Sequence, residues 1–144
     1  MEDKFVDNQG FIISERIAKV FEGNCKQKNS CPVKDVLARF GDKWSMYTVL
    51  RLGQHKKRRF NELKQGINGI SQRMLTVTLR SLEEDGVVLR KVYPEMLPPR
   101  VEYELTGLGK SLLEQLLQLA NWADDNFEGI VKARKSYTKK HRIK

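Results

Sequence analysis

The sequence predicts an α+β fold that is mainly α-helical and contains one small β-hairpin. Apolar residues recur at three- and four-residue steps through most of the chain. Beyond Gly86 the pattern changes, because "VVLRKVY" is rich in β-branched residues and "RVEYELT" alternates apolar with charged side chains. The 144 residues suffice for one domain with a core of its own.

The stretch "GISQRMLTVTLRSLEEDG" predicts a helix over residues 71–85. Ser71 is a good N-cap, because its hydroxyl can accept a hydrogen bond from the first turn, and Gly86 suits the left-handed residue after the last turn. At helical spacing, one face carries Leu75, Leu79 and Leu82, and the opposite face carries Arg73, Val77, Arg80 and Glu84. We expect the leucines to pack; the arginines are either a solvated surface or a binding face.

Three shorter helices are predicted ahead of this one. Their limits are marked by Pro32 and Gly41 for the first, Asp42 and Gly53 for the second, and an N-cap at Asn61 for the third. The third ends near Gly66, and "NGI" turns the chain into helix 71–85. Two short helices joined by a tight turn with glycine are typical of a helix-turn-helix.

The β-hairpin follows the helix-turn-helix directly. Its connection, "PEMLPP", is too rich in proline for regular pairing, so we expect a projecting loop near residues 94–100, flanked by Arg90, Lys91 and Arg100. A helix-turn-helix followed by such a hairpin is a winged helix.

The last predicted helix carries more apolar residues than one small domain covers. Thr106 can cap it. One stripe comprises Leu108, Leu112, Leu116, Leu119, Ala123, Phe127 and Ile130, and a second comprises Leu113, Leu117 and Ala120. The segment "FIISERIAKVF", with Ile13, Ile17, Val20 and Phe21 on one side, has a similar surplus. Both surpluses favour a helical homodimer interface.

These features divide the chain into four segments. They are an N-terminal dimerisation extension (1–30), the winged helix-turn-helix (31–106), a C-terminal dimerisation helix (107–131) and a basic tail (132–144). The tail "KARKSYTKKHRIK" has no acidic residue. Its composition predicts disorder.

The charge of the chain indicates its class of partner. A formal net charge of +9 favours an anionic partner, with nucleic acid ahead of a membrane surface or an acidic protein. The opening "MEDKF" lacks the pattern of a secretory signal, and no run reaches the roughly 20 apolar residues of a membrane span. We therefore expect a cytoplasmic protein without a membrane partner.

No pattern for catalysis or metal binding is evident. The chain shows no nucleophile–base pair and no phosphate-binding glycine loop, and His55 and His141 are isolated. Cys25 and Cys31 are too few for a disulfide scaffold. The sequence thus predicts no enzyme, no catalytic residues, no cofactor and no metal, and it identifies no small-molecule effector.

Four stretches together carry a family resemblance: "CPVKDVLARFGDKW", "RRFNEL", "GISQRMLTVTLRSLEEDG" and "VYPEMLPPRVEYELTGLGKSL". They resemble the HxlR-type family of bacterial winged-helix, MarR-like transcriptional regulators over residues 31–126. The resemblance implies a homodimer on double-stranded DNA, with a recognition helix in the major groove and a wing against the adjacent minor groove. The positions that match DNA-facing residues of the family are Ser71, Gln72, Arg73, Thr76, Arg80 and, in the wing, Arg100.

Further basic residues are candidates for DNA contacts. Arg58 and Arg59, in the loop "QHKKRR", could clamp phosphates or simply be solvated. Lys91 lies beside the wing. Arg100 could enter a narrow minor groove, or instead pair with Glu102 or Glu95.

Cys31 matches a family cysteine placed just ahead of a helix, through which some members sense oxidants or electrophiles. A helix N-terminus, with Lys28 and Lys34 nearby, would favour the reactive thiolate. Alternatively, Cys31 packs as an inert small residue. Cys25 could form an intrachain bridge with it, or Cys31 could pair across a dimer.

The function expected from the sequence is that of a homodimeric transcriptional regulator, thiol-responsive in one reading, that binds a pseudo-palindromic operator. Helix 71–85 would read the major groove. The alternative is a winged-helix module that binds protein through its apolar helices and does not bind DNA specifically.

Overall fold

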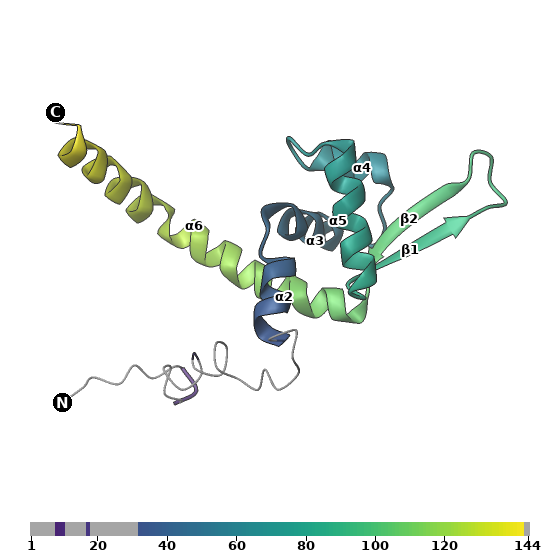
Figure 1. Cartoon of the computed structure of the whole chain (residues 1–144), viewed down its shortest axis with the longest axis horizontal. Coiled ribbons are helices and arrows are strands. Elements are labelled where there is room, and N and C mark those ends of the chain that lie inside the picture. Colours follow the sequence, from purple (N-terminus) through teal and green to yellow (C-terminus); the bar gives the residue numbers. More distant parts are fainter. Residues whose placement is uncertain (1–7, 11–16, 18–31, 143–144) are drawn as a thin grey trace.

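The computed structural model describes residues 8–10, 17 and 32–142. In chain order the elements are α2 (Pro32–Phe40), α3 (Lys43–Gln54), α4 (Phe60–Gly66), α5 (Gln72–Glu84), β1 (Val88–Tyr93), β2 (Arg100–Leu105) and α6 (Gly107–His141). Figure 1 shows a small helical body from which the hairpin and the far part of α6 project in opposite directions. The predicted mainly helical fold with one hairpin is confirmed.

Helix α3 lies at the centre of the body and contacts α2, α4, α5, α6 and β2. Its residues Val49 and Leu52 are almost fully buried. The other side chains that close this core, each at most 2% exposed, are Leu63, Leu75, Leu79, Leu82, Val87 and Val88. The apolar face of α5 thus packs as its sequence spacing predicts, and its opposite face points to solvent.

Three predicted helix caps are present. The Asp42 carboxylate accepts hydrogen bonds from the backbone N–H groups of Trp44 and Ser45, both at 3.0 Å. The Ser71 hydroxyl accepts from Met74 N–H at 3.0 Å, and the Thr106 hydroxyl accepts from Gly109 N–H at 3.1 Å. Each bond satisfies a donor that the first helical turn would otherwise leave unpaired.

Two glycines make the turns on either side of α5. Gly69 has φ +82° in the turn between α4 and α5, and Gly86 has φ +74° just after α5. A side chain at either position would strain the backbone, since φ above zero is costly for residues with a β-carbon. The predicted helix-turn-helix is therefore confirmed as α4, turn and α5.

Two predicted helix limits are wrong. Helix α4 begins at Phe60 rather than after an Asn61 cap, because the Glu62 carboxylate accepts a 2.9 Å hydrogen bond from Arg59 N–H and fixes the earlier start. Helix α3 continues through Gly53 to Gln54. A β-carbon at Gly53 would lie 2.5 Å from Leu113 Cδ2, so this glycine allows α6 to approach α3 and does not end the helix.

The hairpin pairs β1 with β2 in antiparallel register, from Val88 opposite Leu105 to Tyr93 opposite Arg100. Arg58 adds one isolated bridge on the outer side of β2. Its N–H donates to Tyr103 O at 2.9 Å, and Tyr103 N–H donates to Arg58 O at 2.8 Å. The loop before α4 is thereby tied to the base of the hairpin, while residues 94–99 extend from the body as the predicted wing.

Helix α6 is 35 residues long and continues through most of the basic tail to His141. The expectation of disorder after residue 131 is therefore wrong for residues 132–141. Ile130, Val131 and Tyr137 continue the apolar helical spacing of α6 into this segment, and the basic side chains project from the same helix. Even α6 lacks the continuous apolar stretch that a helix needs to cross a membrane, as do the other described helices.

The beginning of α6 packs on the core, and the rest does not. Leu112, Leu113 and Leu116 are half-buried against it. Farther along, the exposed apolar side chains are Leu117 (46%), Leu119 (55%), Trp122 (58%) and Phe127 (59%). In the N-terminal segment, Ile17 is helical and half exposed, while Ile13, Val20, Phe21, Cys25 and Cys31 lie outside the described residues.

Candidate nucleic-acid interface

The exposed face of α5 is the centre of the candidate interface. Arg73 and Arg80 are exposed there, on the side opposite the buried leucines, and Gln72 is exposed as the first residue of the helix. Thr76 is half-buried, and its hydroxyl donates a 2.8 Å hydrogen bond to the carbonyl of Gln72 one turn earlier. Arg73, Thr76 and Arg80 therefore lie on one accessible face of α5, and Gln72 lies at the N-terminal end of the helix.

Arg73 and Arg80 differ from most arginines of the body. In the part of the chain that the structure describes, neither guanidinium has a hydrogen-bond or ion-pair partner. Arg51 instead bonds Gln54, Arg58 pairs with Glu62, and Arg100 pairs with Glu102. Two arginine forks are thus free to bind an external acceptor.

A groove of about 370 Å³ separates the outer side of α5 from the hairpin. Arg80 and Thr76 line it from α5, and Arg90 and Tyr103 line it from the hairpin. Arg90 and Tyr103 stand opposite one another in the strand register, so they share a face of the hairpin. Arg90 is thus a site residue beyond those predicted from the sequence, and strand alternation is the signal that identifies it.

Lys91 and Arg100 lie on the other face of the hairpin. Lys91 is paired with Glu102 and Tyr93 with Arg100, and side chains of successive residues in a strand point to opposite faces, so these pairs lie opposite the face of Arg90 and Tyr103. Arg100 Nε lies 2.7 Å from Glu102 Oε1, and Lys91 Nζ lies 5.3 Å from the centre of the Tyr93 ring. The structure thus contains the Glu102 pairing that the sequence left as an alternative for Arg100.

Glu102 is itself buried and meets a second cation. Lys57 Nζ lies 3.7 Å from Glu102 Oε2. The pKa of Lys57 is raised, first by its hydrogen bond with Tyr93 and then by the nearby carboxylates of Glu102 and Glu104. This face of the hairpin is therefore a network of paired charges, in contrast to the unpaired arginines of α5.

Arg58 and Arg59 are fixed at the start of α4. The backbone of Arg58 bridges to Tyr103, and Arg58 Nη1 lies 3.6 Å from Glu62 Oε2. Arg59 is exposed, and its backbone N–H is the main reason that the pKa of Glu62 is lowered. Both arginines are thus anchored by their main chain next to the helix-turn-helix.

One contact near α5 has no local signal in the sequence. Arg39 on α2 places Nε 2.5 Å from Asp85 Oδ2, and its Nη2 donates to the Ser81 hydroxyl at 3.2 Å. The pKa of Arg39 is raised, chiefly by the hydrogen bond with Asp85. This pair connects α2 to the C-terminal end of α5, across 46 residues of sequence.

The comparisons with known proteins agree with this geometry. A model of the HxlR-like helix-turn-helix matches residues 39–130. The helix-turn-helix transcriptional regulator YybR of Bacillus subtilis is 43% identical over 99 residues, which make up 69% of this chain and 78% of YybR.

Solved structures give the same result. The transcriptional regulator ytfH from Salmonella typhimurium has a TM-score of 0.68 and 32% identity, covering 78% of this chain and 97% of that one. The redox regulator HypR in its oxidized form has a TM-score of 0.61 and 43% identity, covering 67% and 97%. Since the family match extends from α2 into α6, over more than half of the sequence, this chain belongs to the HxlR-like helix-turn-helix family of transcriptional regulators.

Proposed function

We propose that the protein is a homodimeric transcriptional regulator that binds a pseudo-palindromic operator in double-stranded DNA. The observation that carries this proposal is the exposed face of α5, where Arg73 and Arg80 have no partner among the described residues. An arginine fork can donate two hydrogen bonds to guanine O6 and N7 in the major groove. Within a helix-turn-helix, the second helix is the element that enters this groove.

The other predicted residues take supporting roles. Ser71 and Gln72 stand at the N-terminal end of α5, where recognition helices contact base edges. Arg58 and Arg59 contact phosphates beside α4. Arg90, which lies across the groove from Arg80, also contacts a phosphate. Lys91 and Arg100 contact the DNA backbone or minor groove through the wing, and Arg100 must first loosen its pair with Glu102.

The dimer forms through α6. Its outer half projects from the body and exposes Leu119, Trp122 and Phe127. An exposed apolar stripe of this length is typical of a protein interface. A two-fold dimer presents two copies of α5, which matches inverted half-sites about one helical turn of DNA apart.

A thiol response is the regulatory part of the proposal. The name of the similar structure HypR identifies it as a redox regulator. In this chain the candidate thiols are Cys31, one residue before α2, and Cys25, both outside the described residues. Oxidation near the start of α2 would act on the helix that holds the end of α5 through Arg39 and Asp85.

Selection from random-sequence duplexes tests the DNA-binding proposal. The purified full chain should enrich a motif with two inverted halves, and its affinity for that motif should fall steeply with rising salt because cations contact phosphates. If no motif is enriched and all duplexes are bound equally weakly, specific DNA recognition is contradicted. It would favour the alternative of a winged-helix module that binds protein.

A further inference from the structure

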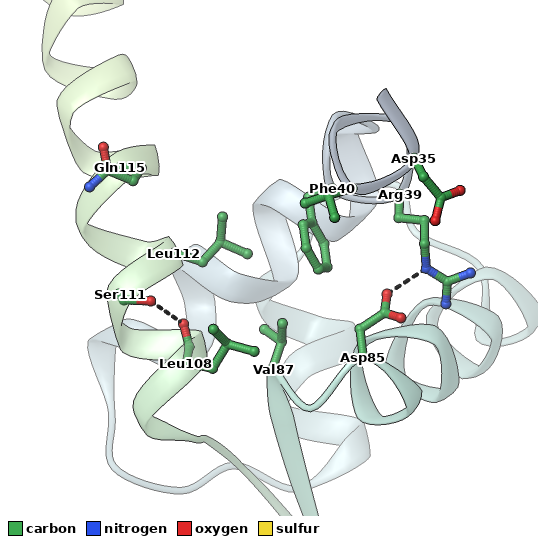
Figure 2. A pocket seen from close by; sticks show the side chains of 10 residues that line it. Asp35, Arg39, Phe40, Asp85, Val87, Leu108, Ser111, Leu112 and Gln115 are labelled. Atoms are coloured by element: carbon green, nitrogen blue, oxygen red, sulfur yellow. Dashed lines mark hydrogen bonds and ion pairs between the residues drawn. The ribbon is translucent and has the colours of Figure 1, made fainter. Parts of the chain in front are cut away.

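A cavity of about 530 Å³ lies between α2, the residues that follow α5, and α6, away from the exposed face of α5. Its volume is in the range of cavities that bind small organic molecules. Figure 2 shows Phe40, Val87, Leu108 and Leu112 directed toward the same space, with the Arg39–Asp85 pair at one side. The floor is therefore apolar, and the charged groups are confined to the edge.

The charge of this edge is acidic. Asp35 and Asp85 line the cavity, and Arg39 is the one basic side chain among the described residues that line it. Arg39 is already engaged, because Nε binds Asp85 at 2.5 Å and Nη2 lies 3.5 Å from Glu84 Oε2. An anionic ligand would have to displace two carboxylates from Arg39, whereas a cation could bind Asp35 directly and compete with Arg39 for Asp85.

We propose that this cavity is a binding site for a small organic cation, namely an apolar ring or chain that carries an ammonium group. The apolar part would lie between Phe40 on α2 and Leu108 and Leu112 on α6. The ammonium group would lie at the edge, near Asp35 and Asp85. Burial of the ring supplies the affinity, and the carboxylates select the sign of the charge.

The site is connected to α5. Asp85 is the residue that ends α5, and Arg39 holds α2 against it. A cation that competes with Arg39 for Asp85 loosens this connection, so ligand binding and DNA affinity become coupled. This regulatory consequence rests on the proposed DNA-binding function, whereas the binding of the cation does not.

Calorimetry on the full chain without DNA tests the site. The probes are naphthylmethylammonium and naphthylacetate, which share a ring system and carry opposite charges. We expect the ammonium to bind once per chain and about tenfold more tightly than the carboxylate. Equal or tighter binding of the carboxylate, or no saturable binding of the ammonium, would overturn the proposal.

Variants locate the bound probe. Leu108→Trp should abolish ammonium binding by filling the cavity, and Leu108 is 58% exposed, so the core does not depend on it. Should that variant misfold by circular dichroism, Val36→Trp on the facing helix serves instead, since Val36 is 48% exposed. Asp35→Asn should weaken binding of the ammonium about threefold or more, whereas Glu95→Gln in the wing loop should leave it unchanged. Unaltered binding in the filled-cavity variant would place the probe elsewhere and refute the site.

Discussion

Gly109, in the first turn of α6, lies against the carbonyl oxygen of Val87 so closely that a β-carbon at position 109 would overlap this oxygen. The Thr106 hydroxyl strengthens the same junction. It donates a 2.6 Å hydrogen bond to the Gly86 carbonyl and accepts one of 3.1 Å from Gly109 N–H. The start of α6 is therefore fixed to the segment that directly follows α5.

Gly109→Ala should lower the free energy of unfolding by about 1–3 kcal/mol or more, because a backbone carbonyl cannot move aside as a flexible side chain can. Urea denaturation monitored by circular dichroism measures this. Gly107→Ala is the matched control, since a β-carbon at Gly107 meets nothing within 4 Å. Similar stability of the two variants would show that the junction is looser than described.

Arg73→Ala should cost about 1–3 kcal/mol of binding free energy on the selected operator and much less on random duplex, because a base contact carries sequence information. Fluorescence anisotropy at fixed salt measures both. Arg51→Ala removes the same charge from α3, where Arg51 bonds Gln54, and should change neither affinity appreciably. Equal losses on both duplexes would reduce Arg73 to a phosphate contact.

Substitutions at Ser71 separate its capping role from a DNA role. Ser71→Ala should destabilise the fold by about 1 kcal/mol, because the Met74 N–H loses its acceptor. Ser71→Asp retains a cap acceptor, so stability should stay close to that of the wild type, while the added carboxylate repels DNA phosphates. A loss of operator affinity in Ser71→Asp without a loss of stability supports the DNA role; unchanged affinity contradicts it.

Trp122→Glu should convert the dimer to a monomer at micromolar concentration, because it places a charge in the exposed apolar stripe of α6. Light scattering after size exclusion measures the mass. Gln118→Glu, at an exposed polar position of the same helix, should remain dimeric. A wild-type chain that is already monomeric and binds DNA as one copy per site would refute the proposed dimer.

Mild peroxide or diamide should weaken operator binding, and dithiothreitol should restore it, if Cys31 acts as the sensing thiol. Cys31→Ser should abolish the response while leaving the affinity of the reduced protein nearly unchanged. Cys25→Ser is measured alongside it. Loss of the oxidant response in both variants indicates a disulfide bridge between Cys25 and Cys31. If oxidants leave the operator affinity of the wild type unchanged, Cys31 is an inert, packed residue.

Local signals in the sequence account for most of the fold. The caps at Asp42, Ser71 and Thr106 each depend on residues within one helical turn, so spacing alone reveals them. The role of Gly53 cannot be predicted from its neighbours, because it is a contact with Leu113, sixty positions away. The basic composition of the tail predicts disorder, whereas residues 132–141 continue the α6 helix that begins at Gly107.

The candidate site divides in the same way. The exposed arginines of α5 follow from the helical period, which sets them opposite the buried leucines. The pairing of Arg39 with Asp85, and the convergence of Lys57 and Arg100 on Glu102, require the tertiary fold. Charge counts along a sequence cannot distinguish a cation held by a distant carboxylate from one that is free to bind DNA.

Because α6 is one uninterrupted helix, insertions and deletions within it change the direction of the side chains that follow. An α-helix turns about 100° and rises about 1.5 Å per residue, so one residue inserted after Leu117 would swing Trp122 and Phe127 about a quarter-turn away from a partner helix. An insertion of about seven residues would restore their direction but lengthen the helix by roughly 10 Å. In the proposed dimer, insertions and deletions in this segment would therefore be constrained to whole turns, and each such step would change the distance between the two copies of α5.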